Sequence, residues 1–312
     1  MNIFKNSFEN PTDEERELIE SYFRGYDYRG AGYTYIANYI WRNTHCLCWE
    51  IIDDYLFMAG ADCMIADPHA AVPMPLSKDG NYNPEKLRGA ILKAKERFRE
   101  KKKKFRMIVI PGHMVELLEA AFPGEMKFDH DRDDDEYVYL KDKLINLSGR
   151  ALHKKKNHMN YFLKNYEYEY REMTSDMADD AMEFIAEFNA KKNIPPHEME
   201  LLKMEERAMK DVFENIEAAK YTAGAIYMNG KIEALSVGGI INSNTMGVHI
   251  EKANTDYRGL YQIINMEFCK HLPKSIKYVN REEDMGLPGL RKAKLSYKPI
   301  KLVEKYIATF KK

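Results

Sequence analysis

The feature that most constrains the fold of this sequence is a run of three short apolar segments joined by two tight turns. The first two, Tyr221–Met228 and Lys231–Ile240, are separated only by Asn229-Gly230, the strongest short-range signal for a two-residue hairpin turn. A second turn at 242–245 leads into Met246–Lys252. The pattern predicts a three-stranded antiparallel meander, which needs helices to cover it.

The elements after this meander alternate between helix and strand. Apolar periodicity predicts helices over Leu260–Leu272 and Leu287–Leu295. Short apolar runs predict strands over Ser275–Val279 and Ile300–Ile307. This order of meander, helix, strand, helix and strand is typical of the acyltransferase architecture called GNAT.

The first half of the chain repeats this order without convincing residue identity. Strand signals run from 46 to 76, Asn83-Pro84 starts a helix, and a strand precedes a short helix at 114–121. We therefore predict an α/β (α+β) protein with two consecutive domains and mixed central sheets, over 1–135 and 136–312. The junction is an acidic run at 129–136, which we interpret as a solvated surface loop.

Composition and charge limit which partners the chain can bind and in which cell compartment we expect it. The chain has 312 residues, 45% of them hydrophobic, and a formal net charge of −1. A nucleic acid or a membrane would therefore have to be bound by a local patch. No apolar run reaches the ~18 residues of a membrane-spanning helix, and the N-terminus lacks the apolar core of a secretory signal. We expect a cytoplasmic protein with reduced cysteines.

A polar turn follows the third predicted strand and leads into a helix. It contains Tyr257, Arg258 and Gly259, and unpaired N–H groups at a helix start can bind a phosphate or carboxylate. The alternative is a plain helix entry in which Gly259 serves only the turn. On the preceding strand, Glu251 could accept a proton from an attacking amine, and we expect His249 to share its strand face. An ordinary ion pair of Glu251 with Lys252 or Arg258 is equally compatible with the sequence.

The strand predicted at 275–279 is followed by a highly polar segment. Four ionisable groups, from Arg281 to Asp284, come directly after an apolar run, and Arg291 and Lys292 follow on the next helix. Such a density of charge indicates either a lined site or a solvated loop.

A third segment, 147–162, predicts a helix with clustered cations. Lys155, Asn157 and His158 are among its polar residues, and such a helix can bind phosphates of a tRNA, a lipid head group or a nucleotide, or simply face solvent. Its histidines, five residues apart, do not share a helix face, and the cysteines lack zinc spacing. We therefore predict no metal site.

Three stretches together carry a family resemblance. They read SGRALHKKKNHMNYF at 148–162, HIEKANTDYRGLYQIINMEF at 249–268 and NREEDMGLPGLRKAKLSYKP at 280–299. In them the chain resembles uncharacterised bacterial proteins that share the C-terminal domain of phosphatidylglycerol lysyltransferases. The resemblance implies tandem GNAT-like (acyl-CoA N-acyltransferase) domains and a relation to aminoacyltransferases that use charged tRNA. Those lysyltransferases carry a membrane-embedded N-terminal region that this sequence does not show, so the expected acceptor need not be a phospholipid.

The family pattern also marks candidate site residues. They are Lys155, Asn157, His158, Glu251, Lys252, Tyr257, Arg258, Gly259, Asn280, Arg281, Asp284, Gly286, Leu290, Arg291 and Lys292. Among these, Glu251 is our candidate catalytic base, and Arg258 with Gly259 is the candidate anchor for a phosphate or carbonyl. Arg281, Arg291 and Lys292 are expected to contact donor phosphates, and Asn254 of the polar turn joins the donor-binding set.

The leading hypothesis from these residues is an acyl- or aminoacyl-transferase without a protein nucleophile. Its co-substrate would be aminoacyl-tRNA or acyl-CoA, its acceptor an amine or hydroxyl, and no cofactor would be tightly bound. The lone glycine of the polar turn favours tRNA over CoA. An acyl-CoA-dependent N-acetyltransferase and a non-catalytic module that binds an anionic small molecule or lipid head group are the alternatives.

Overall fold

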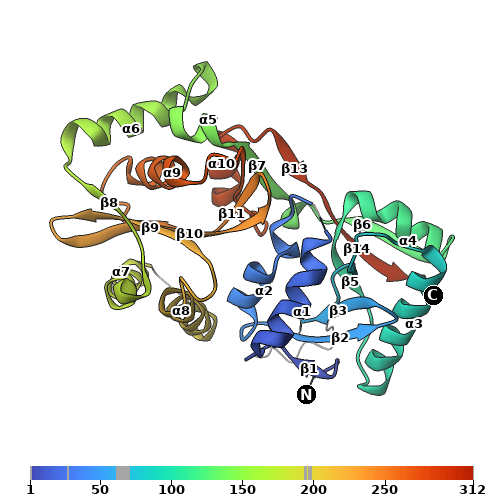
Figure 1. Ribbon diagram of the computed structural model, residues 1–312. Coiled ribbons are helices and arrows are strands. Elements are labelled where there is room, and N and C mark those ends of the chain that lie inside the picture. Colours follow the sequence, from blue (N-terminus) through green and yellow to red (C-terminus); the bar gives the residue numbers. More distant parts are fainter. Residues whose placement is uncertain (1, 27, 61–70, 193–194, 196–198, 312) are drawn as a thin grey trace. The chain divides into compact units, whose positions relative to one another are not determined.

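A computed structural model of the chain describes residues 2–26, 28–60, 71–192, 195 and 199–311. These residues form two compact units, Met1–Glu136 with Val303–Lys312, and Tyr137–Leu302 (Figure 1). The chain therefore returns to the first unit at its C-terminal end, whereas we predicted 136–312 as one continuous domain.

Among its described residues, the first unit contains two sheets, and a β-bridge joins them. The four-stranded sheet has the order β1-β2-β3-β4, and the three-stranded sheet has the order β5-β14-β6. The bridge is a parallel pairing of Val72 with Met107. The elements of this unit are β1 (Asn6–Ser7), α1 (Asp13–Arg24), α2 (Tyr35–Trp41), β2 (Cys48–Ile52), β3 (Tyr55–Ala59), β4 (Leu76–Ser77), α3 (Pro84–Glu100), β5 (Met107–Pro111), α4 (Val115–Ala121), β6 (Met126–His130) and β14 (Lys305–Phe310).

Local sequence signals explain where the helices of this unit begin. The hydroxyl of Thr12 accepts the N–H of Glu15, and the carboxylate of Glu15 accepts the N–H of Thr12, which forms a capping box before α1. The side chain of Asn83 caps α3, which starts with Pro84.

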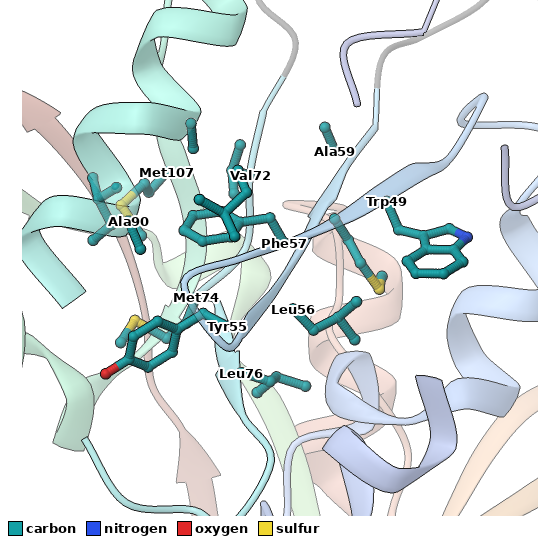
Figure 2. Close-up of a cluster of buried hydrophobic side chains, with 14 of the residues drawn as sticks. Trp49, Tyr55, Leu56, Phe57, Ala59, Val72, Met74, Leu76, Ala90 and Met107 are labelled. Atoms are coloured by element: carbon teal, nitrogen blue, oxygen red, sulfur yellow. The ribbon is translucent and has the colours of Figure 1, made fainter. Parts of the chain in front are cut away.

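The core of the first unit gathers residues from both sheets and from α3. Phe57, Val72, Ala90 and Met107 belong to one cluster of buried side chains (Figure 2). This cluster includes residues of β5 and β14 as well, so the two sheets share one core.

The side chain of Tyr33 links the backbone of β5 to that of Met74, which lies just before β4. The hydroxyl of Tyr33 donates to the carbonyl of Val109 at 3.0 Å and accepts the N–H of Met74 at 3.0 Å. Tyr33 is buried, and burial raises the pKa of its phenol well above the ordinary value. Where the segment around Met74 separates from β5, a neutral side chain therefore satisfies the backbone.

The acidic run at 129–136 is only partly the solvated loop that we predicted. β6 extends into it, and Asp135 and Glu136 are buried. The carboxylate of Glu136 is paired with the ammonium group of Lys305 at 2.8 Å, and Asp135 accepts the backbone N–H of Lys305 at 3.0 Å. These two carboxylates therefore anchor β14 between its neighbouring strands.

The second unit is built on a seven-stranded sheet of order β13-β7-β12-β11-β10-β9-β8. The predicted meander is confirmed as β9, β10 and β11, and Asn229 and Gly230 both have positive φ at its first turn. The predicted strand Ile300–Ile307 is divided between β13 of this sheet and β14 of the first unit. The elements are β7 (Glu136–Leu140), α5 (Lys141–Asn146), α6 (His153–Asn165), β8 (Glu169–Glu172), α7 (Ala178–Ala190), α8 (Met199–Glu214), β9 (Thr222–Met228), β10 (Lys231–Asn242), β11 (Thr245–Ala253), α9 (Leu260–His271), β12 (Tyr278–Asn280), α10 (Pro288–Ser296) and β13 (Lys301–Val303).

A β-bulge in β11 decides which of its side chains face which helices. The register against β10 shifts between Val237 and Gly238, and this shift leaves His249 as the extra residue. Beyond the bulge, Glu251 contacts α9 and Lys252 contacts α8, which lie on opposite sides of the sheet (Figure 1). A Cβ at Gly247 would lie 3.1 Å from Cε1 of His249, so His249 is on the face of Gly247, opposite to that of Glu251. The prediction that His249 shares a strand face with Glu251 is therefore wrong.

Candidate functional site

Two parallel strands diverge in the second unit and open the sheet at their carboxyl ends. β11 and β12 are paired only over Thr245–Gly247 and Tyr278–Asn280. β11 continues to Ala253, whereas β12 ends at Asn280. The polar segments that follow both strands therefore start at the same edge of the sheet, where ligand sites form in folds with parallel strands.

Glu251 and Arg281 form an ion pair at this opening. Nη2 of Arg281 lies 2.6 Å from Oε1 of Glu251, and the two side chains are 13% and 9% exposed. On α9, Nδ2 of Asn265 donates to the second carboxylate oxygen at 3.2 Å. Burial by itself lowers the pKa of Arg281, but the negative charge of Glu251 and the nearby phenols of Tyr297 and Tyr139 together raise it above the ordinary value. The sequence left open an ion pair of Glu251 with Lys252 or Arg258, whereas its partner in the structure is Arg281.

Three buried polar atoms near this pair have no hydrogen-bond partner in the described part of the chain. They are Nη1 of Arg281, Oδ1 of Asn265 and Oγ of Ser236, the residue opposite Glu251 on β10. Each such atom costs about 1–3 kcal/mol when it is left unpaired. Folded proteins keep few of them, so their grouping around one carboxylate is typical of a site that binds a polar group.

A second cation, Lys155 of α6, lies over the same aromatic ring as Arg281. Nζ of Lys155 is 4.5 Å and Cζ of Arg281 is 4.8 Å from the ring centroid of Tyr297. Burial, and to a smaller extent the charge of Arg281, lowers the pKa of Lys155. Two cations and the carboxylate of Glu251 give this cluster an excess of positive charge, which suits an anionic group.

The main chain that carries Arg281 is fixed by a buried lysine. Nζ of Lys294 donates to the carbonyl oxygen of Arg281 at 2.6 Å and also to that of Glu283. Burial lowers the pKa of Lys294. Because Lys294 belongs to α10, this helix holds the loop after β12 in place.

Asp284 and Arg291 form a second ion pair within the same loop and helix, with Asp284 fully buried and the side chain of Arg291 32% exposed. The guanidinium of Arg291 donates to both carboxylate oxygens of Asp284 at 2.8 and 2.7 Å, and the hydroxyl of Tyr137 donates to one of them. Hydrogen bonds from Arg291 lower the pKa of Asp284 to about 2. We predicted that Asp284 and Arg291 bind the donor, but in the structure these two residues bind each other.

The predicted anion-binding turn packs against α6. Gly259 has a φ of +99°, and a Cβ at this position would clash with the carbonyl oxygen of His158. Nε of Arg258 donates to Nδ1 of His158 at 3.4 Å, and its guanidinium lies 4.7 Å from the ring centroid of Tyr161. Burial and the charge of Arg258 lower the pKa of His158. Close packing of α9 on α6 therefore explains why this position is glycine.

The remaining predicted residues lie outside the cluster of Lys155, Glu251 and Arg281. Asn254 accepts a hydrogen bond from the N–H of Asp256 within the turn, and the ring of Tyr257 contacts Tyr166. Asn280 is buried and caps the loop that follows β12. Asn157 and Lys292 are exposed.

Four polar or aromatic residues next to the cluster of Lys155, Glu251 and Arg281 were not predicted from the sequence. Gln262 and Asn265 are polar residues within an otherwise apolar run on α9, a signal that could have found them. The hydroxyl of Tyr297 accepts a hydrogen bond from Gln262 at 2.9 Å, and Tyr297 stands within the third family stretch. Ser236, in an apolar strand, has no distinguishing local signal.

A separate polar pair involves the bulged residue of β11. Nδ1 of His249 lies 2.7 Å from Oε1 of Glu282, and the His249 side chain is 1% exposed. Its Nε2 is buried and has no hydrogen-bond partner within the described ranges. The loop after β12 thus contacts β11 through Arg281 and Glu282.

Within the described residues, no group of three or more His, Cys, Asp or Glu side chains could hold a metal ion. No described helix is long and apolar enough to span a bilayer. Cys48 and Cys269 are free and buried, whereas Cys46 is disulfide-bonded. The prediction of reduced cysteines is therefore wrong for Cys46, and Cys63 lies outside the described residues.

Comparison with solved structures confirms the predicted fold. A conserved protein of unknown function from Bacteroides thetaiotaomicron is 34% identical, with a TM-score of 0.87 and full coverage of both chains. L-PGS from Bacillus licheniformis is 11% identical, with a TM-score of 0.66 and coverage of 99% of this chain and 93% of that one. A tandem GNAT protein from the clavulanic acid biosynthesis pathway is 10% identical, with a TM-score of 0.53 and coverage of 98% and 97%. The chain has the α/β fold of tandem GNAT-like proteins.

Sequence comparison agrees with the resemblance. An uncharacterised protein of Mycoplasmoides gallisepticum is 28% identical over 174 residues, which are 55% of this chain and 54% of that protein. The match thus spans about half the length of this curated relative. The family described as phosphatidylglycerol lysyltransferase, C-terminal, matches residues 23–309. Since this match covers nearly the whole chain, the protein belongs to the family of phosphatidylglycerol lysyltransferase C-terminal domains.

Proposed function

We propose that this protein transfers an aminoacyl or acyl group from an activated ester to an amine or hydroxyl acceptor. Membership of the family supports an aminoacyl-transferase type of activity. The observation that carries the proposal is the partly buried cluster of Lys155, Glu251 and Arg281 where β11 and β12 diverge.

In the proposed reaction, the two cations of this cluster stabilise the developing negative charge. The acceptor attacks the ester carbonyl, the ester C–O bond breaks, and the donor leaves as an alcohol that takes up a proton. In this proposal, Arg281 and Lys155 interact with the carbonyl oxygen as it becomes an oxyanion. Removing one preorganised donor of this kind typically costs about 10²–10³ in kcat.

Glu251 is our candidate base, with one carboxylate oxygen paired with Arg281 and the other available to accept a proton. Its Oε1 is engaged by Arg281. Its Oε2, which accepts the longer 3.2 Å hydrogen bond from Asn265, would receive the proton of the attacking amine or hydroxyl. A role as base predicts that Glu251→Gln removes the acidic limb of the pH–rate profile. A role limited to orienting Arg281 would lower the rate without changing the shape of that profile.

We propose aminoacyl-tRNA rather than acyl-CoA as the donor, with no tightly bound cofactor. The one glycine at the entry of α9 is used for packing against His158. Lys154 and Lys156 are exposed on α6 and could neutralise RNA phosphates, so binding of tRNA should weaken steeply with salt. A tRNA donor would place the reaction in the cytoplasm.

The test is transfer of labelled amino acids from a mixture of charged tRNAs to two kinds of acceptor, phosphatidylglycerol vesicles and small amines. Lys155→Met and Arg281→Met should each lower kcat by about 100-fold. Lys164→Met, which changes an exposed cation at the far end of α6, is the matched control and should stay within about twofold of the wild type. Equal losses in all three variants would contradict the assignment of the site.

Two other functions have distinct outcomes in the same experiments. Acetyl transfer from acetyl-CoA, with no transfer from charged tRNA, would replace the proposal with an N-acetyltransferase. Recovery of a bound, unchanged ligand with every donor and acceptor would favour a non-catalytic module that binds an anionic small molecule or lipid head group.

A further inference from the structure

The segment 285–303 differs from the rest of the chain in charge and exposure. It contains five lysine or arginine residues and no aspartate or glutamate, in a chain whose formal net charge is −1. Four of its large apolar side chains are unusually exposed, with Met285 at 61%, Leu287 at 52%, Ile300 at 49% and Leu295 at 42%. Large aliphatic groups that face water next to cations mark an interaction surface.

The exposed position of Met285 and Leu287 is built into a braced turn. Met285 and Gly286 have φ values of +51° and +69°, and the N–H of Leu287 donates to the carbonyl of Asp284 at 2.9 Å. The carboxylate of Asp284 also accepts the N–H of Gly286 at 3.0 Å and is held by Arg291. A tight turn with two central residues at positive φ, tied to this ion pair, keeps these apolar side chains on the surface.

The exposed side of α10 continues this surface. Lys292 and Leu295 are three residues apart and adjoin on the helix, and Lys298 follows at the helix end. All three are exposed, whereas Lys294 is buried beneath them. No carboxylate within the described ranges is paired with Lys292 or Lys298. We call Met285, Leu287, Lys292, Leu295 and Lys298 the α10 patch.

We propose that the α10 patch docks this protein onto the surface of an anionic phospholipid membrane. The aliphatic side chains enter the boundary between head groups and acyl chains, and the lysines bind lipid phosphates, the division of roles typical of peripheral membrane segments. The patch favours a membrane over RNA because its apolar members are aliphatic, and single-stranded RNA is gripped by aromatic stacking. The proposal does not depend on the transfer reaction.

The experiment is flotation of the full chain with vesicles of phosphatidylcholine alone or mixed equally with phosphatidylglycerol, without donor or acceptor. The wild type should bind the mixed vesicles and much less of the neutral ones, and moderate salt should weaken binding. Lys292→Gln with Lys298→Gln should weaken binding about twentyfold, at roughly fivefold for each lysine. Met285→Ser with Leu287→Ser should weaken it at least about tenfold.

Two matched controls report on charge and apolar exposure elsewhere in the same unit. Lys164→Gln removes an exposed lysine of α6, and Ile240→Ser removes an apolar side chain that is 52% exposed on β10. Both should bind like the wild type. The proposal is overturned if the wild type ignores phosphatidylglycerol, or if the α10 patch variants bind as well as the controls. It is also overturned if the lysine variants lose only tRNA binding, or if the variants change only the oligomeric state.

Discussion

Asp284 illustrates how one buried carboxylate can hold a loop and a helix together. It is 0% exposed and accepts hydrogen bonds from Arg291, Tyr137 and the N–H of Gly286. Arg291 is the main reason that the pKa of Asp284 falls to about 2. The sequence marked Asp284 and Arg291 as donor contacts, and the structure supports a role in positioning the loop that carries Arg281.

Asp284→Asn should therefore lower the free energy of unfolding by about 3 kcal/mol at pH 7, because it leaves the charge of Arg291 without its buried partner. The folded pKa of about 2 lies below the unfolded value of ~3.9. The stabilisation by Asp284 is thus complete above pH ~4 and is lost as the pH falls toward 2. Urea unfolding at pH 7 and pH 3 measures this, and the gap between wild type and variant should narrow at pH 3.

The control for this prediction is Asp256→Asn, which breaks an exposed ion pair with Lys191. Such an exposed pair is screened by water and contributes little to stability. A gap between wild type and Asp284→Asn that is the same at both pH values would contradict the account given for Asp284.

At the scale of elements, the entry of α9 is shaped by its neighbour α6. Gly259→Ala introduces a Cβ against the carbonyl oxygen of His158 at a residue with a φ of +99°. Gly149→Ala is the matched control, because Gly149 has a φ of +98° and open space around it. Both variants incur backbone strain of about 1–2 kcal/mol. Gly259→Ala should lose roughly 1–3 kcal/mol more, since the helices must move apart.

Chemical denaturation of the two glycine variants provides the measurement. The difference between them isolates the packing of α9 on α6 from the strain of positive φ. If Gly259→Ala and Gly149→Ala lowered the free energy of unfolding equally, α6 would be able to move away from the new Cβ at little cost. Packing would then not explain Gly259, and anion binding would again be an explanation for it.

In each unit, polar groups lie where two neighbouring chain segments separate, but these groups differ in charge. In the first unit, the neutral hydroxyl of Tyr33 satisfies the backbone of Met74 and Val109. In the second unit, a charged pair lies where β11 and β12 diverge, next to buried polar atoms that have no hydrogen-bond partner among the described residues. The electrostatic case for an anion site therefore applies to the second unit.

At the scale of the whole molecule, the C-terminal strand completes the sheet of the first unit. β14 lies between β5 and β6 and pairs with both. Removal of residues 304–312 should expose the N–H groups of both neighbours and the buried carboxylate of Glu136. Hydrogen exchange should then become much faster in β5 and β6, while β9 to β11 keep their protection as an internal reference. Unchanged exchange in β5 and β6 would contradict this dependence.

Local structure was largely predictable because it depends on residues that are close in the sequence. Asn229-Gly230 specified a hairpin through its positive φ angles, and Asn83-Pro84 specified a helix start. The family stretches added Lys155, Glu251 and Arg281 to the candidates, and these three lie together in the structure. The sequence by itself therefore determined the order of elements and the family.

Only the tertiary structure decided which residues meet. One extra residue in β11 turns Glu251 toward α9 and separates it from His249, because a bulge shifts every later side chain to the other face. Burial turned Asp135, Glu136 and Asp284 from expected surface or donor-binding groups into paired anchors. β14, which we predicted as part of the second domain, belongs to the three-stranded sheet of the first unit. These outcomes depend on pairing and desolvation between residues far apart in the chain, which no local pattern specifies.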